Sequence, residues 1–319
     1  MTAAAPSQTP DAPAARVRRV ADAVRRRVLE YTLKNNGGYL SQACSSAELL
    51  ATLYLRSMRL GASRAPLTPR PFAGVPGPDN PDAFTGADYN GPRAPELDRF
   101  IFSPVHYALV LYSLLIELGR LGPNGLDAFN QDGSTVELIG AEHSPGHEVT
   151  AGSLGQALSQ AGGIALARRL RGETGRVWVL LSDGEFQEGQ TWEAFAALGH
   201  HRIGNLGVVI DANAQQCDGA MADVMTIEPL AARLRAFGAD VHEVDGHDSD
   251  ALAAAAEGLG DGPDGHGRPL AIIARTDPCR GIELMRERMP RIHYVRFKSD
   301  AEFQAYQDLL ARMTAEAGA

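Results

Sequence analysis

Four short apolar segments, separated by longer helix-like stretches, constrain the fold of this 319-residue chain more than any other feature. Each segment is rich in Val, Ile and Leu and is almost continuously apolar, which is typical of a strand buried on both faces of a sheet. Strands that alternate with helices usually pair in parallel. The sequence therefore predicts an α/β fold with a mostly parallel central sheet, helices on both of its faces, and strands at 177–182, 206–211, 241–244 and 270–274.

The rest of the chain is predicted to form one domain over residues 15–319, after a disordered tail at 1–14 that lacks the apolar stretch of a signal peptide. A Pro- and Gly-rich insertion at about 61–95 is predicted to be a long loop. Phe84, Tyr89 and Asn90 in this loop are candidates for a channel entrance, with a surface loop or a subunit contact as the alternative. Helices are expected at 15–34, from a cap at Ser45 and Ser46 through Met58, and at 104–121, 153–170 and 300–315.

The composition excludes several classes of protein. Apolar residues make up 44% of the chain and charged residues 22%, as in a soluble globular protein. The formal charge of −9 argues against a nucleic-acid-binding surface. An apolar run of about 18 residues is absent, so no membrane span is expected. The three cysteines have no metal-binding spacing, and we expect reduced thiols in a cytoplasmic protein.

Two predicted strands end in oxygen-bearing side chains. Asp183 and Gly184 follow the first strand, and Asn213 follows the second, two residues after Asp211. If the strands are neighbours, Asp183 and Asn213 converge, and their oxygens suit Mg²⁺, or Ca²⁺ in its place. Gly184 lets the backbone approach a diphosphate at the start of the following helix. The alternative is an ordinary strand–turn–helix in which Asp183 caps the helix.

These residues belong to longer stretches that resemble a known family. "DGEFQEGQTWEA" (183–194) and the Asn thirty residues after its Asp resemble the thiamine-diphosphate motif of transketolases, with Ser182 in place of its first glycine. "PGHEVTAGSLGQALSQAGGIALA" (145–167), "LDRFIFSPVHYALVLYSLLIELG" (97–119) and "NNGGYLSQACSSAELLATLY" (35–54) resemble further transketolase segments in the same order. The resemblance covers nearly the whole chain beyond the tail.

The resemblance implies specific roles. Asp183, Asn213 and the backbone carbonyl of Gln215 would bind the metal ion. The thiamine diphosphate itself would be bound by these three residues together with His106, Gly152, Ser153, Leu154, Gly184, Glu185 and His293. The residues taking part in catalysis would be His106, Glu188, Glu193 and His293, the two glutamates as part of an acidic network that crosses a subunit interface.

Several of these residues have a plain structural alternative. Glu188 and Glu193 can form an exposed helix face, and His293 can be a surface-loop histidine. For His143 and His147, packing or solvation is the favoured interpretation, although one of them is a candidate for the substrate channel. Cys217 is interpreted as a packing residue.

All matched segments resemble the N-terminal domain of transketolases. The domain that carries the glutamate which activates the cofactor has no counterpart in the chain. The resemblance therefore implies one subunit of a split enzyme, active only with a separate C-terminal subunit that supplies this glutamate, in an assembly of two copies of each. The implied reaction is transfer of a two-carbon ketol unit from a ketose or ketose phosphate to an aldehyde acceptor.

The sequence also departs from the family, which leaves the substrate open. Asn35 and Leu138 stand where transketolases carry substrate-contacting histidines. Imidazoles at these positions bind hydroxyl groups and move protons, so their loss weakens the expectation of the usual sugar phosphates. Two alternatives remain: a subunit of an enzyme that decarboxylates a 2-oxo acid and joins the remainder to an acceptor, and a non-catalytic binding subunit.

Overall fold

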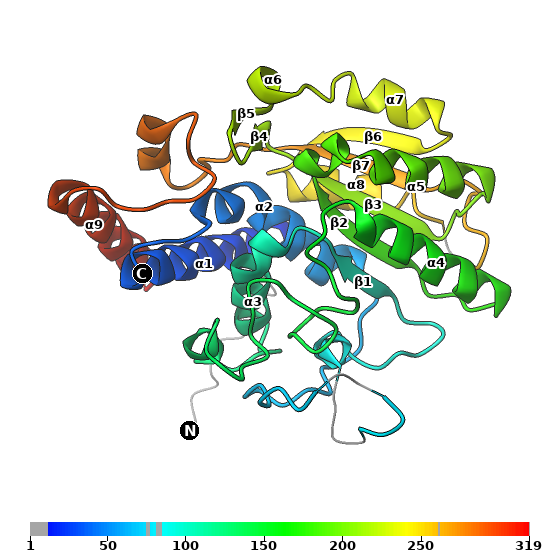
Figure 1. The fold of residues 1–319 in the computed structure, drawn as a ribbon, viewed down its shortest axis with the longest axis horizontal. Helices are drawn as coiled ribbons and strands as arrows, with labels where there is room; N and C mark the ends of the chain where they lie inside the picture. The colour runs from blue at the N-terminus through cyan, green and yellow to red at the C-terminus, as the bar shows by residue number, and fades with distance from the viewer. Residues whose placement is uncertain (1–11, 75–76, 81–84, 261, 319) are drawn as a thin grey trace, which may run out of the picture.

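The computed structural model describes residues 12–74, 77–80, 85–260 and 262–318 (Figure 1). Its centre is a five-stranded sheet in which every neighbouring pair is parallel, in the order β1-β2-β3-β7-β6. This confirms the predicted α/β class with a mostly parallel sheet. The strands are β1 (Arg99–Phe102), β2 (Val177–Ser182), β3 (Leu206–Ala212), β6 (Asp240–Asp245) and β7 (Leu270–Arg275).

Both faces of the sheet are buried, because alternate residues of each strand enter different cores. In β2, Trp178 and Leu180 pack on one face, and Val179 and Leu181 on the other. The first face is covered by α1 (Pro13–Lys34), α2 (Leu40–Thr52), α3 (Ala108–Glu117) and α8 (Ser249–Ala256), with α9 (Asp300–Ala317) packed on the outside of α1. The second face is covered by α4 (Gln156–Leu170), α5 (Gly189–His200) and α7 (Leu230–Ala236), as Figure 1 shows.

The edge strand β1 is absent from the sequence prediction, whereas the four predicted strands lie within one residue of their observed bounds. β1 is only four residues long and pairs with β2 alone, from Arg99 opposite Val177 to Phe102 opposite Leu180. So short an apolar run carries little periodic signal. Its strand conformation depends on a partner that lies far away in the sequence.

The predicted cap at Ser45 and Ser46 is wrong, because α2 begins at Leu40 and both serines lie buried inside it. The hydroxyl of Ser46 donates to the carbonyl of Gln42 at 2.7 Å, and that of Ser45 donates to the carboxylate of Asp211 at 2.6 Å. Their side chains therefore find partners inside the fold, which removes the usual conflict between serine and a helix interior. A π-helical turn, Leu53–Ser57, separates α2 from Met58.

The described residues of the predicted insertion include a 3-10 turn, Gly86–Tyr89, and an isolated bridge between Gly77 and Asn80, and they are joined to the loop before α4. The amide of Gly86 donates to the carbonyl of Glu142 at 2.7 Å, and a Cβ on Gly86 would lie 1.7 Å from the carbonyl oxygen of Ser144. Tyr89 and Asn90 are buried in this packing, so the prediction that they form a channel entrance is wrong. Phe84 lies outside the described residues, as does the predicted tail up to residue 11. Helix α1 begins at Pro13, two residues before the predicted start.

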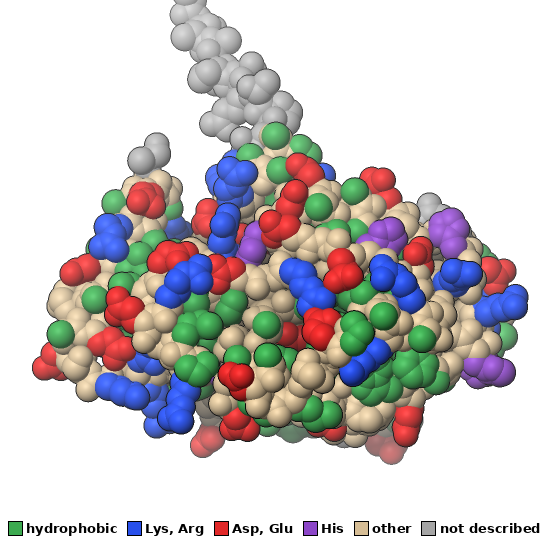
Figure 2. Space-filling model, turned by 90° about the horizontal axis from the view of Figure 1, so that it is seen from above, with side chains coloured by type: hydrophobic (Ala, Val, Ile, Leu, Met, Phe, Trp, Pro, Cys, Tyr) green, Lys and Arg blue, Asp and Glu red, His purple; other side chains and the backbone are tan. Residues whose placement is uncertain are grey.

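The surface mixes charge types. Figure 2 shows acidic and basic side chains interspersed over one face, with hydrophobic groups between them. Among the described helices, none combines the length and apolarity that crossing a membrane requires.

Candidate cofactor site

A cavity of about 350 Å³ lies at the carboxyl ends of β2 and β3, where Ser182 and Asp211 are paired. In an open parallel sheet this is the edge at which ligands bind. The 3-10 turn Asp183–Gln187 follows β2, and the hairpin of β4 (Gln215–Gln216) and β5 (Gly219–Ala220) follows β3. The predicted site residues on the cavity wall are His106, Leu154, Gly184, Glu188, Asn213, Gln215 and His293.

Asp183 is a buried carboxylate that the described residues satisfy only in part. Its Oδ2 accepts a hydrogen bond from the amide of Ala214 at 2.7 Å, but its Oδ1 has no hydrogen-bond partner among the described residues. Burial, and then the charge of Asp211, raise the pKa of Asp183 well above its usual value. A buried, unpaired carboxylate oxygen is unfavourable without a cation. The alternative that Asp183 caps the following turn is wrong, because Ser182 and Glu185 form the capping box there.

Asn213 has a fixed amide orientation. Its Nδ2 donates to Tyr107 Oη at 3.0 Å and to Asp211 Oδ2 at 3.2 Å. Because the carboxylate can only accept, the amide nitrogen must face Asp211, and Oδ1 lies on the opposite side. That oxygen accepts from the amide of Gln215 at 2.9 Å and has a second lone pair for a metal ion.

Asp211 lies behind Asn213 and is satisfied by the protein. In addition to Asn213, the hydroxyls of Ser45, Tyr107 and Thr276 donate to it at 2.6, 2.8 and 2.5 Å. These donors stabilise its negative charge, but burial outweighs them and raises the pKa of Asp211. Asp211 and Tyr107 both hold the amide of Asn213 in place. The sequence shows Asp211 at a strand end but gives no sign of these contacts, so neither residue is predicted to support the site.

The oxygen donors fit a magnesium ion that also binds a diphosphate. Asp183 and Asn213 lie beside the turn that carries Gln215, and carboxylate, amide and carbonyl oxygens are the hard ligands that Mg²⁺ prefers. In the described part of the chain, no group of three or more His, Cys, Asp or Glu side chains is arranged to hold a metal. A site with one carboxylate does not complete an octahedral shell by itself. Phosphate oxygens and water would have to supply the other ligands.

His106 and His293, far apart in the sequence, lie side by side at the cavity. Their ring centroids are 5.0 Å apart, and Tyr39 packs against both rings, at 5.8 Å from His106 and 5.5 Å from His293. Burial, and then the neighbouring His293, lower the pKa of His106 to about 3. Burial also lowers the pKa of His293. Both imidazoles are therefore neutral at physiological pH.

The other predicted site residues lie around the cavity rather than on its wall. Glu185 is fully buried and accepts from the amides of Ser182 at 2.9 Å and Gly155 at 3.0 Å, and from the hydroxyl of Ser103. It thereby ties β2 to the end of β1 and the start of α4. Asp183 lies beneath the wall, Gly152 and Ser153 precede Leu154, and Glu193 is exposed on α5.

Two histidines from the loop before α4 pack inside the protein, away from the cavity. His143 Nε2 lies 3.1 Å from Glu137 Oε2, and its ring packs on Phe72 at 4.4 Å. His147 is fully buried against Phe102 at 5.2 Å. This is the packed alternative expected from the sequence. The interpretation of Cys217 as a packing residue is wrong, because its side chain is exposed at the cavity.

Comparison with known proteins agrees with this geometry. Residues 83–277 match the family described as "Transketolase, thiamine diphosphate binding domain". The chain is 33% identical to the putative uncharacterized transketolase family protein y4mO of Sinorhizobium fredii, over 92% of this chain and 94% of that protein. It is 30% identical to the 6-deoxy-6-sulfo-D-fructose transketolase subunit SqwG of a Clostridium species, over 82% of this chain and 84% of that protein.

The fold also matches solved transketolases. The transketolase of Pichia stipitis superimposes with a TM-score of 0.67 at 22% identity, over 96% of this chain but 45% of that enzyme. The transketolase of Leishmania mexicana gives a TM-score of 0.65 at 21% identity, also over 45% of its length. The fold is therefore that of an α/β protein, and the family match identifies a thiamine-diphosphate-binding domain. The chain belongs to the transketolase family.

Proposed function

We propose that this chain is the cofactor-anchoring subunit of a two-component transketolase that transfers a two-carbon ketol unit from a ketose or ketose phosphate to an aldehyde. The observation that carries this proposal is that Oδ1 of buried Asp183, beneath a cavity wall that includes Asn213, has no hydrogen-bond partner among the described residues. Relatives of similar length support it. Besides SqwG, an apulose-4-phosphate transketolase subunit of Actinobacillus succinogenes is 28% identical over 91% of this chain and 94% of that protein.

The predicted site residues would share the binding of the cofactor. Asp183, Asn213 and the carbonyl of Gln215 would hold Mg²⁺, or Ca²⁺ in its place. The amide of Gly184, with neutral His106 and His293, would face the diphosphate, and Leu154 would contact the ring system together with the backbone at Gly152 and Ser153. Glu185 would act indirectly, by fixing these loops. When bound, thiamine diphosphate supplies an electron sink for a carbanion.

The partner subunit would supply the glutamate that activates the cofactor. Glu188 is exposed at the cavity and Glu193 is exposed on α5, so both are accessible to another chain. We assign them to an acidic network across the interface, in an assembly of two copies of each subunit. We place this assembly in the cytoplasm, where the free thiols of Cys44, Cys217 and Cys279 would stay reduced.

The deciding experiment measures thiamine-diphosphate binding and ketol transfer with the chain alone and with a candidate partner subunit. We expect activity only in the mixture, and loss of that activity with Asp183→Asn. Full activity of the chain alone would overturn the two-component proposal. Release of CO₂ from a 2-oxo acid donor would favour the decarboxylating alternative. Cofactor binding without turnover with any partner would favour a non-catalytic binding subunit.

A further inference from the structure

Gln42, near the start of α2, contacts His293 through its side-chain amide. The side chain is buried, and its Nε2 lies 3.2 Å from the carbonyl oxygen of His293 and 3.4 Å from Nδ1 of the same residue. Its Oε1 accepts from the hydroxyl of Ser41 at 3.0 Å. One amide therefore meets both the backbone and the ring of a histidine that lies 251 residues further along the chain.

These contacts determine where the imidazole carries its proton. A backbone carbonyl can only accept, so the atom of Gln42 that faces it must be the amide nitrogen. The second N–H of the same amide then faces Nδ1, which can accept it only if it carries no proton. We propose that Gln42 is a positioning residue that holds His293 in the neutral tautomer with its proton on Nε2. Nothing in the sequence pattern indicates this, because the two residues meet only in the folded chain.

The surroundings of His293 favour the neutral ring. Burial lowers its pKa, and the nearby charge of Asp218 opposes this only as a smaller effect. A proton on Nδ1 would also bring two N–H groups together at Gln42, which is unfavourable. The titratable and charged groups that lie with His293 on the cavity wall, in the adjoining cavity of about 340 Å³ or in ring contact are Tyr39, His106, Tyr107, Glu188, Cys217, Asp218, Arg291 and Tyr294.

The tautomer decides what His293 can do at the cavity. With Nδ1 occupied by Gln42 and the proton on Nε2, the ring is a hydrogen-bond donor and has no free nitrogen to act as a base. It would bind an oxygen of the diphosphate or of a ketose rather than remove a proton. This consequence rests on the proposed function, whereas the tautomer itself does not.

His247 provides an internal reference with the opposite tautomer. Its Nε2 accepts from the amide of Asp277 at 2.8 Å, so the proton lies on Nδ1, which is 3.1 Å from Glu48 Oε2. The two histidines should therefore give opposite patterns in one spectrum.

The test is ¹⁵N NMR of the imidazole rings in the cofactor-free full chain at neutral pH, with the two signals assigned from His293→Gln and His247→Gln. We expect the Nε2–H form for His293 and the Nδ1–H form for His247. The inference is overturned if wild-type His293 carries its proton on Nδ1, is an even mixture of the two forms, or is doubly protonated. This first measurement requires no variant at position 42.

A variant that changes the charge at position 42 then measures the effect of the Gln42 amide on the tautomer of His293. Gln42→Glu replaces a donor by a carboxylate at Nδ1, so we expect the proton to move to Nδ1 and the pKa of His293 to rise. Gln187→Glu is the matched control: it adds the same charge to the same cavity wall, but Gln187 contacts Met221 and Met225 instead. An unchanged His293 in Gln42→Glu, or the same change in Gln187→Glu, would contradict the role of Gln42.

Titration with thiamine diphosphate and Mg²⁺ separates this inference from the proposed function. Failure of the cofactor to bind, with His293 in the expected form, would reject the proposed function and leave the tautomer intact. Cofactor binding with His293 in the other form would reject the tautomer alone. If both hold, the Nε2 signal should shift on binding, since that N–H would gain an acceptor.

Discussion

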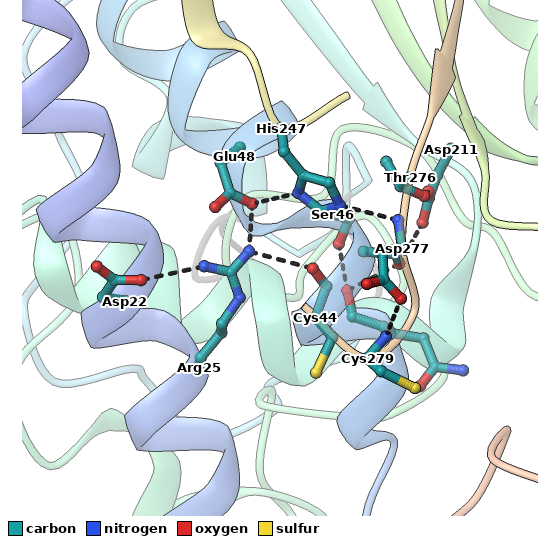
Figure 3. A network of polar contacts seen from close by, with 12 residues as sticks. Asp22, Arg25, Cys44, Ser46, Glu48, Asp211, His247, Thr276, Asp277 and Cys279 are labelled. Atoms are coloured by element: carbon teal, nitrogen blue, oxygen red, sulfur yellow. Dashed lines mark hydrogen bonds and ion pairs between the residues drawn. The ribbon is translucent and has the colours of Figure 1, made fainter. Parts of the chain in front are cut away.

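Two clusters of charged side chains contact α2, one at Glu48 and the other at Ser45, and they differ in whether the chain compensates their buried charge. In the cluster of Asp22, Arg25, Glu48, His247 and Asp277, Arg25 contacts Asp22, Glu48 and the carbonyl of Cys44, and Glu48 also contacts His247 (Figure 3). We call it the Arg25 cluster. Its only side-chain nitrogen without a partner in the described part of the chain is Arg25 Nε.

Near the cavity, by contrast, the negative charge of Asp183 has no ion-pair partner among the described residues, and its Oδ1 accepts no hydrogen bond from them. Burial of both groups has a desolvation cost, but the Arg25 cluster offsets it within the chain. Burial opposes ionisation of Glu48, yet hydrogen bonds from His247 and the charge of Arg25 lower its pKa below the usual value. The pKa of Asp183 moves in the opposite direction. Compensated charge thus indicates a structural role, and uncompensated charge indicates a ligand.

Breaking the compensated cluster should have the largest effect on stability. Arg25→Met leaves Glu48 buried without its guanidinium partner, and we expect the free energy of unfolding to fall by about 3–5 kcal/mol. Urea denaturation measures this. Arg27→Met is the matched control on the same helix, because the Arg27–Glu117 pair is partly exposed and should be worth about 1 kcal/mol or less. Equal losses for the two variants would contradict the conclusion that Arg25 compensates a buried charge.

Removing the uncompensated charge should have the opposite effect on the cofactor-free chain. Burial raises the pKa of Asp183, so its ionised form opposes folding at neutral pH. Asp183→Asn should therefore raise the free energy of unfolding by on the order of 1–3 kcal/mol, a gain that disappears as the pH falls to about the usual carboxyl pKa of 3.8.

The same variant should lose the cofactor. We expect Mg²⁺-dependent binding of thiamine diphosphate to weaken by more than about 100-fold, because the only carboxylate ligand is gone. Calorimetry on Asp183→Asn and on the exposed Asp218→Asn, as a control, measures both stability and binding. A destabilised Asp183→Asn that still binds the cofactor would show that Asp183 is structural after all.

A variant of Asp211 tests whether a carboxylate that is hydrogen-bonded within the protein still contributes to metal-dependent cofactor binding. Asp211→Asn keeps the shape of the side chain but places an amide where Asn213 and three hydroxyls now donate. We expect Asn213 to lose its fixed orientation and metal-dependent binding to weaken by about 10–100-fold, as for other residues that orient a metal ligand. High Mg²⁺ should restore binding in this variant and fail to do so in Asp183→Asn. The midpoint of a Mg²⁺ titration distinguishes the two.

The parts of the fold that can be predicted from the sequence are those with a local signal. The runs at β2 and β3 contain no polar side chain before Ser182 and Asp211, and the polar residues that follow them indicate that Asp183 and Asn213 lie at one edge of the sheet. The resemblance to transketolases adds His106 and His293, which no local pattern relates to each other.

The missed features depend on contacts between distant segments. The hydroxyl of Ser45 is satisfied by Asp211, 166 residues away, and without that contact the serine resembles a helix cap. Tyr107 contacts Asp211 and Asn213 across more than 100 residues, so its role at the site has no sequence signature. Asn35, the replacement for a family histidine, is exposed and donates to the carbonyl of Tyr31 at 2.8 Å. It is not on the cavity wall, where Tyr39 and Gln42 are found instead.

His147 is a buried neutral group that belongs to neither cluster. Burial lowers its pKa to about 4, and its Nε2 has no partner among the described residues, so protonation there would bury an unpaired N–H. The unfolded chain takes up this proton first, near the usual pKa of 6.5. His147 should therefore lower the free energy of unfolding as the pH falls from about 6.5 to 4, by at most about 1.4 kcal/mol per pH unit.

His147→Gln removes this titration, so its stability deficit relative to wild type should shrink as the pH is lowered from 7 to 5 in urea denaturation. The control is Tyr112→Phe, which alters the ring packing beside His147 but exchanges no proton in this range, since burial raises the pKa of Tyr112. Its deficit should stay constant with pH. A pH-independent deficit for His147→Gln would mean that the ring can be protonated inside the fold, and that this buried site is more open to water than its packing against Phe102 indicates.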